Sequence, residues 1–175
     1  MSSSPSILDL GCGNSKTAGA LGMDILPGPQ VDLVHDLNRL PWPFEDGGFD
    51  AIHCRDVLEH LEDIPRVLQE IHRVARKGAR VHITTPHYSC ANAYTDPTHR
   101  QRLGFFSFDY VTGASPLAYY STARYALVKR AIIFHPGLKN VLVWRLANRW
   151  PAFYERHLAW ILPAWFLSVE LEVLK

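Results

Sequence analysis

Two glycines, Gly11 and Gly13, directly follow an apolar run that ends at Leu10. Glycine is needed where a ligand touches backbone, because it has no side chain and tolerates positive φ. In an open parallel sheet, the turn after the first strand is where nucleotide-like ligands bind. An ordinary tight turn also explains a Gly-x-Gly sequence, so the motif alone predicts little.

Two acidic residues stand at the ends of the next two apolar runs, Asp24 before Ile25 and Asp36 before Leu37. The Asp24 carboxylate can accept two hydrogen bonds from a ribose, while Ile25 covers one face of the attached base. Asp36 can accept from an exocyclic amine, and Leu37 can cover the opposite face. Each aspartate alone could simply begin a turn, but together with the glycines they favour a nucleoside site.

The same stretch disfavours a pyrophosphate ligand. A dinucleotide fold has a third glycine and an acid about 20 residues further on, but Ser15 stands at the glycine position and Asp24 follows too soon. No Gly-Lys-Ser/Thr sequence is present to hold a triphosphate. We therefore expect a nucleoside without phosphates, and a nicotinamide-dependent reductase is the less favoured alternative.

A second polar group lies between Thr85 and His99. It contains two imidazoles and a carboxylate, from His87, His99 and Asp96, and histidine is the side chain best suited to accept a proton near neutral pH. We expect His99 to act as the catalytic base, with Asp96 orienting it or the substrate, and His87 as the second candidate. Alternatively, Asp96 caps a turn and His99 lies on the surface.

No metal centre or cysteine nucleophile is predicted. The spacing of His87, Asp96 and His99 lacks the His-x-x-x-His regularity typical of zinc sites. His60 is expected at the edge of a cleft or in packing. Cys12, between two glycines, is expected to pack as a small apolar group beneath the ligand.

Aromatic residues surround the same segment and have two interpretations. They form either the wall of a substrate pocket or a second small core that packs the segment on the sheet. The residues are Tyr88, Tyr94, Phe105, Phe106, Phe108 and Tyr110. For substrate binding, we single out Tyr88, Tyr94, Phe105 and Phe106.

Short apolar runs alternate with connections, which is the pattern of an α/β fold. The runs before residue 90 resemble strands buried on both faces, whereas the last run alternates apolar and polar residues as a half-exposed strand does. Strands are predicted at Ser6–Leu10, Leu21–Ile25, Val31–His35, Phe49–His53, Ala79–Thr85, Tyr125–Phe134 and Phe166–Leu174.

The clearest helix spans Ile64–Ala75, where apolar residues recur at i, i+3, i+4 and i+7. Asp63 can cap its start, Pro65 is tolerated in its first turn, and Gly78 follows its end. A strand, helix and strand in this order form a right-handed crossover between parallel neighbours. Leu138–Trp160 is predicted to hold one or two aromatic-rich helices broken near Pro151.

The composition favours one folded domain over residues 1–175, because 47% hydrophobic and 20% charged residues suit a packed core. The uncharged stretch Leu158–Val169 is interrupted by Pro163 and is shorter than the roughly 20 residues that cross a bilayer. The N-terminus does not resemble a secretory signal. Three separated cysteines without a Cys-x-x-Cys pair fit a reducing, cytoplasmic setting.

A basic and aromatic stretch near the C-terminus, with Arg145, Arg149 and Arg156 among several tryptophans, is compatible with an anionic membrane surface. A solvated helix face over an aromatic core, or a contact in a homodimer, is favoured over peripheral membrane binding. Nucleic-acid binding is not expected, because the net charge is only +1.

An ordered set of motifs resembles the class I S-adenosylmethionine-dependent methyltransferases, and most closely the small type 11 group. The motifs are Leu8–Gly13, Asp24, Leu40–Phe44 followed by Phe49–Ile52, Val57–Leu61, and the helix leading to Gly78. They cover roughly residues 6–87, about half the chain. The resemblance implies a Rossmann-like, doubly wound, seven-stranded sheet, mostly parallel with an antiparallel C-terminal strand, and S-adenosyl-L-methionine as cofactor.

The resemblance also implies roles for single residues. Asp9 and the turn Gly11–Gly13 would hold the methionine end, and Asp24 the ribose. Asp36 and Leu37 would contact adenine. The chain at Arg55 and Asp56 would pass the amino-acid end or the sulfonium.

The sequence departs from the common pattern of this group at its start. Only Met1–Pro5 precede the first strand, and Asn14–Leu21 leaves barely two turns for the first crossover helix, which is usually longer. We expect a cofactor cleft that is less covered on this side. The missing lid would come from residues 88–175 or from a second subunit.

The expected function is methyl transfer to a small-molecule, sugar or lipid-linked acceptor. This in-line displacement needs chiefly alignment, and O-methylation is preferred because the candidate bases suggest that a proton must leave. The alternative is a catalytically silent S-adenosylmethionine-binding module that recruits a partner through its aromatic and basic C-terminal part. Only the enzyme would form S-adenosylhomocysteine when an acceptor is present.

Overall fold

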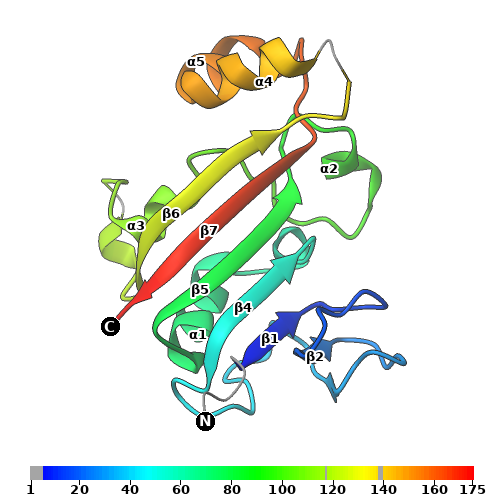
Figure 1. The fold of residues 1–175 in the computed structure, drawn as a ribbon, viewed down its shortest axis with the longest axis vertical. Helices are drawn as coiled ribbons and strands as arrows, with labels where there is room; N and C mark the ends of the chain where they lie inside the picture. The colour runs from blue at the N-terminus through cyan, green and yellow to red at the C-terminus, as the bar shows by residue number, and fades with distance from the viewer. Residues whose placement is uncertain (1–5, 117, 138–139) are drawn as a thin grey trace.

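The computed structural model describes residues 6–116, 118–137 and 140–175. Its centre is a seven-stranded sheet in the order β3-β2-β1-β4-β5-β7-β6 (Figure 1). The strands are β1 Ile7–Leu10, β2 Leu21–Asp24, β3 Leu33–Val34, β4 Phe49–Arg55, β5 Ala75–Pro86, β6 Arg124–Ile133 and β7 Phe166–Leu174. Strands β1 to β5 pair in parallel, and β7 is antiparallel to both β5 and β6. The predicted α/β fold, with its mostly parallel sheet and antiparallel C-terminal strand, is confirmed.

The helices are short except for two. They are η1 Leu58–His60, α1 Ile64–Val74, α2 Asn92–Thr95, α3 Asp109–Thr112, η2 Ala118–Tyr120, α4 Asn140–Arg149, α5 Pro151–Phe153 and η3 Tyr154–Leu158. The predicted break near Pro151 is confirmed, because Trp150 leaves helical geometry between α4 and α5. Leu138, where the helical stretch was predicted to begin, lies outside the described residues.

Helix α1 begins as predicted and ends at Val74, one residue before its predicted end. The Asp63 carboxylate accepts a hydrogen bond from the Arg66 amide at 3.0 Å, and Pro65 lies in the first turn. The strand that follows begins at Ala75, four residues before its predicted start at Ala79. Ala75 is already extended and pairs with Phe49 of β4, so the chain passes from helix to strand without a loop. Gly78, at φ +79°, lies inside β5.

One face of the sheet carries the main hydrophobic core. Val67, Ile71 and Val74 of α1 pack there against β-strand residues such as Ile52 and Val81. Helices α1 and α3 lie on this side of the sheet (Figure 1).

The opposite face is open, so the prediction that the early strands are buried on both faces is wrong. His53 and His82 protrude from it, and no helix within the described ranges covers it. The chain between Gly11 and Ala20 forms only turns, because so short a connection between parallel strands leaves no room for a packed helix. Strands β1 and β2 still pair in parallel.

A second, smaller cluster joins the C-terminal helices to the end of β6. Ile132, Ala147 and Tyr154 are fully buried in it. The Asn148 side chain of α4 accepts from the Ile132 amide and donates to the Ile132 carbonyl, both at 2.8 Å. These helices are therefore attached beyond the sheet's end (Figure 1). Of the helices in the described part of the chain, none has the length and apolar character to cross a membrane.

Candidate active site

The cleft predicted at the strand ends is present as a cavity of about 810 Å³. It lies where β1, β2 and β4 end, next to the loop after β3. Its walls are formed by Gly11, Asp24, Ile25, Leu26, Asp36, Leu37, Asn38, Asp56, Val57, His60, Leu61, Pro97, Thr98 and Arg100. Six of the ten predicted cofactor residues therefore line one cavity.

Gly11 explains why the first turn must contain glycine. Its φ is +62°, and a Cβ atom built there would lie 2.5 Å from Cγ2 of Val57. The Gly11 amide donates to the Met23 carbonyl at 2.8 Å, which fixes the turn against β2. The bare backbone of this turn faces the cavity.

Asp24 is oriented by backbone donors and still faces the cavity. Its two carboxylate oxygens accept from the amides of Gly13 at 2.9 Å and Leu26 at 3.0 Å. Each oxygen retains a lone pair that a ribose hydroxyl could use. Ile25 beside it is 60% exposed, which is unusual for an isoleucine next to a strand and suits an apolar ligand face.

Asp36 and Leu37, in the loop after β3, also line the cavity. One Asp36 oxygen accepts from the Asn38 amide at 2.9 Å and from the Asn38 side chain at 3.1 Å, so part of its bonding capacity serves the local turn. The Leu37 carbonyl accepts from the indole of Trp42 at 3.2 Å. Glu70 of α1 in turn accepts from the Trp42 amide at 2.7 Å, which anchors this loop to the helix.

Asp9, Cys12 and Arg55 support the first turn and do not line the cleft. One Asp9 oxygen accepts from the Thr17 amide at 2.6 Å and from the Arg55 guanidinium at 2.7 Å. Arg55 also donates to the Ser15 carbonyl at 2.6 Å. Cys12 is buried as predicted, and burial together with nearby Asp24 and Asp9 raises the pKa of its thiol.

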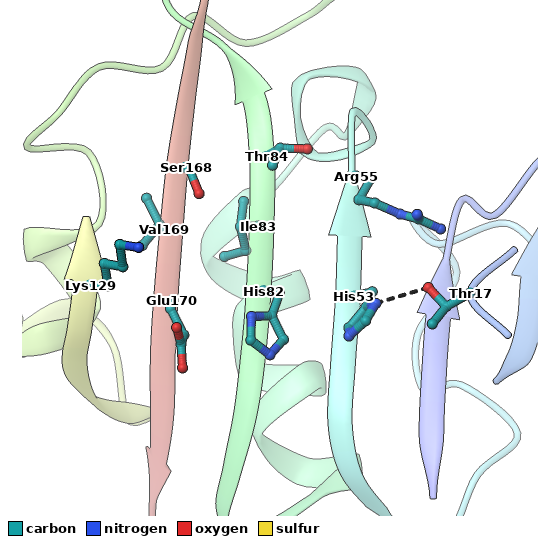
Figure 2. A pocket seen from close by; sticks show the side chains of 10 residues that line it. All are labelled: Thr17, His53, Arg55, His82, Ile83, Thr84, Lys129, Ser168, Val169 and Glu170. Atoms are coloured by element: carbon teal, nitrogen blue, oxygen red, sulfur yellow. Dashed lines mark hydrogen bonds between the residues drawn. The ribbon is translucent and has the colours of Figure 1, made fainter. Parts of the chain in front are cut away.

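The Arg55 side chain points to the open face of the sheet, where a second cavity of about 440 Å³ lies (Figure 2). His53 and His82 project there from neighbouring strands, with ring centres 5.0 Å apart. The Thr17 hydroxyl is 2.9 Å from Nδ1 of His53. Arg55 therefore lines this second cavity and not the predicted cofactor cleft.

Asp56 occupies an uncommon backbone conformation at the end of β4. Its φ is +53°, a left-handed geometry that non-glycine residues adopt rarely and often at functional sites. The Thr84 hydroxyl donates to its carboxylate at 3.2 Å. Burial raises the pKa of Asp56, because water is partly excluded from its charged form.

Glu59 and His99 form a buried carboxylate–imidazole pair beside His60, which lines the cleft, whereas Glu59 and His99 themselves do not. Nε2 of His99 lies 4.0 Å from Oε1 of Glu59 and 3.8 Å from Oδ2 of Asp96. The rings of His60 and His99 meet edge to face, with centres 4.6 Å apart. The amides of Arg100 and Gln101 both donate to the Glu59 carbonyl, which holds the two segments together.

Sequence reasoning missed Glu59. The residue is 2% exposed and its Oε2 accepts from the Thr85 hydroxyl at 3.0 Å. Burial raises the pKa of Glu59 and lowers that of His60, whose neighbour His99 lowers it further. A glutamate enclosed between Leu58 and Leu61 was the available signal, since charged residues are rarely buried without a partner.

The other two predicted catalytic residues have structural partners. His87 is fully buried, with Nδ1 2.9 Å from the Ser89 hydroxyl and Nε2 3.1 Å from Glu155, and it does not line the cleft. Asp96 accepts from the amide and the hydroxyl of Thr98, at 2.8 and 2.6 Å. These bonds lower the pKa of Asp96 and match the turn-capping alternative.

The four predicted substrate-binding aromatics lie outside the cleft wall. Tyr88 and Phe105 pack against the second cluster, as the small-core alternative predicts, and the Tyr88 hydroxyl donates to the Glu155 carbonyl at 2.9 Å. Phe106 packs edge to face on Phe105. Tyr94 is half exposed, with the Arg102 guanidinium 4.8 Å from its ring centre.

A group of potential metal ligands is present, although none was predicted. One ligand atom from each of Glu59, His60 and His99 lies within 4.8 Å of the other two. His87 and Asp96, which the sequence had suggested as ligand types, take no part in it. Of these three residues, His60 lines the cleft.

Comparison with known families gives one match over nearly the whole chain. The family model described as "Methyltransferase domain" matches residues 2–165. A 2-phytyl-1,4-naphtoquinone methyltransferase of Nostoc punctiforme is 36% identical over 80 residues, which are 46% of this chain and 34% of that protein. A demethylmenaquinone methyltransferase of Lysinibacillus sphaericus is 37% identical over 57 residues, 33% of this chain and 24% of that protein. The matched stretch thus spans about a third or less of these relatives.

Solved structures agree with the fold. A SAM-dependent methyltransferase of Archaeoglobus fulgidus superposes with a TM-score of 0.66 at 17% identity, covering 96% of this chain and 86% of that chain. The 1,6-didemethyltoxoflavin-N1-methyltransferase of Burkholderia thailandensis, solved with S-adenosylhomocysteine, gives a TM-score of 0.59 at 12% identity, covering 98% and 72%. At these identities the likeness concerns the fold alone.

Proposed function

The chain belongs to the methyltransferase-domain family, and from this premise we propose that it transfers a methyl group from S-adenosylmethionine to a small-molecule acceptor. One observation carries the proposal. A single cleft is lined by Asp24 and Leu37, which suit a ribose and a base, and by His60, whose ring packs on that of His99. S-adenosylmethionine supplies an electrophilic methyl group on a sulfonium.

The cleft residues fit this cofactor. Asp24 holds the ribose hydroxyls, and Ile25 and Leu37 enclose the base. The turn at Gly11 receives the methionine end, because Gly11 lines the same cleft as Asp24. Asp56 also lines the cleft, and an anionic carboxylate there suits a positive sulfonium.

The proposed acceptor is a hydroxylated small molecule bound in the cleft beside His60 and Thr98. As the new carbon–oxygen bond forms and the sulfur–carbon bond breaks, His99 accepts the hydroxyl proton. Glu59, whose carboxylate lies 4.0 Å from Nε2 of His99, stabilises the resulting imidazolium. The named relatives act on naphthoquinone-type compounds, which supports an apolar ring in the acceptor.

Product formation tests this proposal. Purified protein would be incubated with S-adenosylmethionine and a panel of naphthols and quinols, and S-adenosylhomocysteine would be quantified. We expect one acceptor class to support turnover, and His99→Ala to lower kcat by about 10²-fold or more. His157→Ala, at an exposed histidine remote from the cleft, is the control. Cofactor binding without product for any acceptor would instead favour the silent module.

A further inference from the structure

We infer that Glu59, His60 and His99 form a binding site for one divalent transition-metal ion beside the cleft. The location rests on the three ligand atoms that lie within 4.8 Å of one another. The catalytic use of the ion rests on the proposed function, whereas the site itself does not. No such site follows from the sequence, because the two segments are joined by long-range contacts, among them the bonds from the amides of residues 100 and 101 to the Glu59 carbonyl.

Glu59 is the first reason. It is 2% exposed, and Oε1 is a buried oxygen without a hydrogen-bond partner among the residues that the structure describes. An unpaired buried carboxylate oxygen is costly, and a cation is the ligand that would compensate it. The oxygen faces Nε2 of His99 at 4.0 Å, a gap that two acceptor-type atoms can share with an ion between them.

The second reason is the support around His60. The Thr98 hydroxyl is 2.9 Å from Nδ1 of His60 and 2.6 Å from the Asp96 carboxylate. This chain of hydrogen bonds fixes the ring and leaves Nε2 for coordination. Carboxylate-supported histidines of this kind are typical of metal ligands.

Two imidazoles and one carboxylate select the type of ion. Such a donor set suits Zn²⁺, Co²⁺, Mn²⁺ or Fe²⁺ and disfavours Ca²⁺ and Mg²⁺, which prefer oxygen ligands. Ligands about 2.0–2.2 Å from the ion must approach to roughly 3.5 Å from one another, so the side chains close by about an ångström on binding. Three protein ligands leave a position open.

The open position assigns the ion a role in the proposed reaction. An acceptor hydroxyl bound there loses its proton to water more readily, because the ion lowers its pKa. The methyl group then passes from sulfur to that oxygen, and the neutral thioether leaves. When the ion is bound, His99 coordinates it and no longer accepts the proton. The ion then promotes loss of the hydroxyl proton in place of His99.

Cobalt titration tests the site without cofactor or acceptor. The full chain, dialysed against EDTA, is titrated with Co²⁺ and followed by visible absorption and calorimetry. We expect one ion per chain, with the intense absorption bands of four- or five-coordinate cobalt. Glu59→Gln and His99→Ala should each weaken binding by about tenfold or more, while His157→Ala should bind like the parent. Circular dichroism confirms folding, and His60→Gln replaces any variant that does not fold.

A spectrum of free aqueous cobalt at one equivalent, or equal loss in His157→Ala, would overturn the site. Either result leaves the proposed methyl transfer intact, because that reaction is followed separately by S-adenosylhomocysteine formation. Conversely, cobalt binding without any turnover would retain the site and remove its catalytic use.

Large apolar side chains are exposed on the C-terminal hairpin, the surface formed by α4, α5, η3 and the turn to Leu162. Leu142 is 75% exposed, Trp160 67% and Ile161 73%, and Trp144, Trp150 and Phe153 are also exposed. We propose that this hairpin surface binds an anionic lipid bilayer.

Charge points to lipid as the occupant. Arg145, Arg149 and Arg156 lie within the hairpin, whose one acidic residue is Glu155. The Glu155 carboxylate is turned inward, accepting from the Phe105 amide at 2.5 Å and lying 3.1 Å from His87. Tryptophan and arginine together on an amphipathic helix are typical of membrane interfaces.

The hairpin also adjoins the acceptor side of the molecule. The ring centre of Trp160 lies 5.5 Å from that of Tyr88 and 6.5 Å from that of Tyr94, in the segment that leads to Thr98. In Figure 1 the hairpin lies at the same end as the tips of the parallel strands. A lipid-linked acceptor could therefore reach the cleft from the bilayer.

Vesicle sedimentation tests this surface. We expect the chain to sediment with phosphatidylcholine vesicles that contain phosphatidylglycerol, and much less with phosphatidylcholine alone or at high salt. The double variant Trp144→Ser/Trp160→Ser should bind about tenfold more weakly, and Val34→Thr, at an exposed residue of β3, should bind normally. Absence of sedimentation would contradict the proposal. A dimer in light scattering that the double variant abolishes would assign the surface to a second copy instead.

Discussion

At the scale of single residues, Gly11 and Gly13 provide a matched pair. Both have positive φ, but a Cβ atom would contact Val57 at 2.5 Å from position 11 and nothing within 4 Å from position 13. We expect Gly13→Ala to lower the free energy of unfolding by about 1 kcal/mol through backbone strain, and Gly11→Ala by about 3 kcal/mol through strain and overpacking. Urea unfolding measures both. Equal losses would show that the close approach to Val57 has no energetic consequence.

Glu59 gives a prediction with a defined pH dependence. Burial raises the pKa of Glu59 in the folded state, so its charge opposes folding in protein freed of metal. Below its ordinary pKa of 4.5 both states hold the proton, and the penalty appears as the pH rises through the folded pKa. The free energy of unfolding of Glu59→Gln, taken relative to the parent protein, should therefore be about 1 kcal/mol higher at pH 8 than at pH 4. This corresponds to about 2–4 °C in Tm. Thermal melts in EDTA would contradict this if the variant lost stability with rising pH.

Residue types with local signatures could be read from the sequence. Asp24, Asp36 and Asp56 all line the cleft, and each lies at or just after the end of a recognisable strand. Glu59 could not be paired with His99 in the same way, because their proximity depends on the path of the intervening chain. The sequence suggested His87 as a catalytic residue because it is a histidine. In the structure it is buried and hydrogen-bonded to Ser89 and Glu155, so its contacts are structural.

At the scale of elements, contacts with α1 hold the loop that carries Asp36 in position. Glu70 accepts from the Trp42 amide at 2.7 Å and from Arg73 at 2.6 Å, and it is nearly fully buried. Removing one member of such a pair leaves unpaired polar groups, so Glu70→Ala should cost about 2–3 kcal/mol in unfolding free energy and weaken cofactor binding. Chemical denaturation and calorimetry measure the two effects.

Arg66→Ala is the control for this variant, because Arg66 is an exposed residue of the same helix. It should change neither quantity by more than about 0.5 kcal/mol. If Glu70→Ala and Arg66→Ala unfolded at the same denaturant concentration, contacts other than those of Glu70 would hold the loop.

Periodicity identified the elements well and their surroundings poorly. The alternation in Phe166–Leu174 and the apolar stripe of α1 both correspond to observed burial. The open face could not be foreseen, because His53 and His82 stand in runs that otherwise resemble buried strands. The start of β5 was placed four residues too late, because Gly78, expected between the helix and the strand, lies inside the strand.

At the scale of the whole molecule, ligand binding should affect one end of the sheet selectively. We expect S-adenosylhomocysteine to slow amide hydrogen exchange in residues 11–26, 36–38 and 56–61, which surround the cleft. Exchange in α4 should not change, because this helix packs on β6, the edge strand farthest from β2 and β3 in the sheet. Mass spectrometry of peptides resolves these regions. Uniform slowing over the chain would indicate global stabilisation and no localised site.

The two halves of the molecule differed in how far sequence could describe them. The family motifs cover roughly residues 6–87, and there the order of strands and the cleft follow the resemblance. Beyond residue 87, neither periodicity nor motifs fixed the path of the chain. Which aromatic side chains are buried, such as Phe108, and which are exposed, such as Trp160, required the structure.

The central claim is that the cleft beside Gly11 and Asp24 holds the adenosine part of S-adenosylmethionine. Calorimetric titration of the purified chain with S-adenosylhomocysteine tests it most directly. We predict saturable heat at one ligand per chain, a rise in Kd of about tenfold or more for Asp24→Ala, and no change for Glu45→Gln at an exposed residue outside the cleft. Titrations without heat, or equal affinity in folded Asp24→Ala, would contradict the claim.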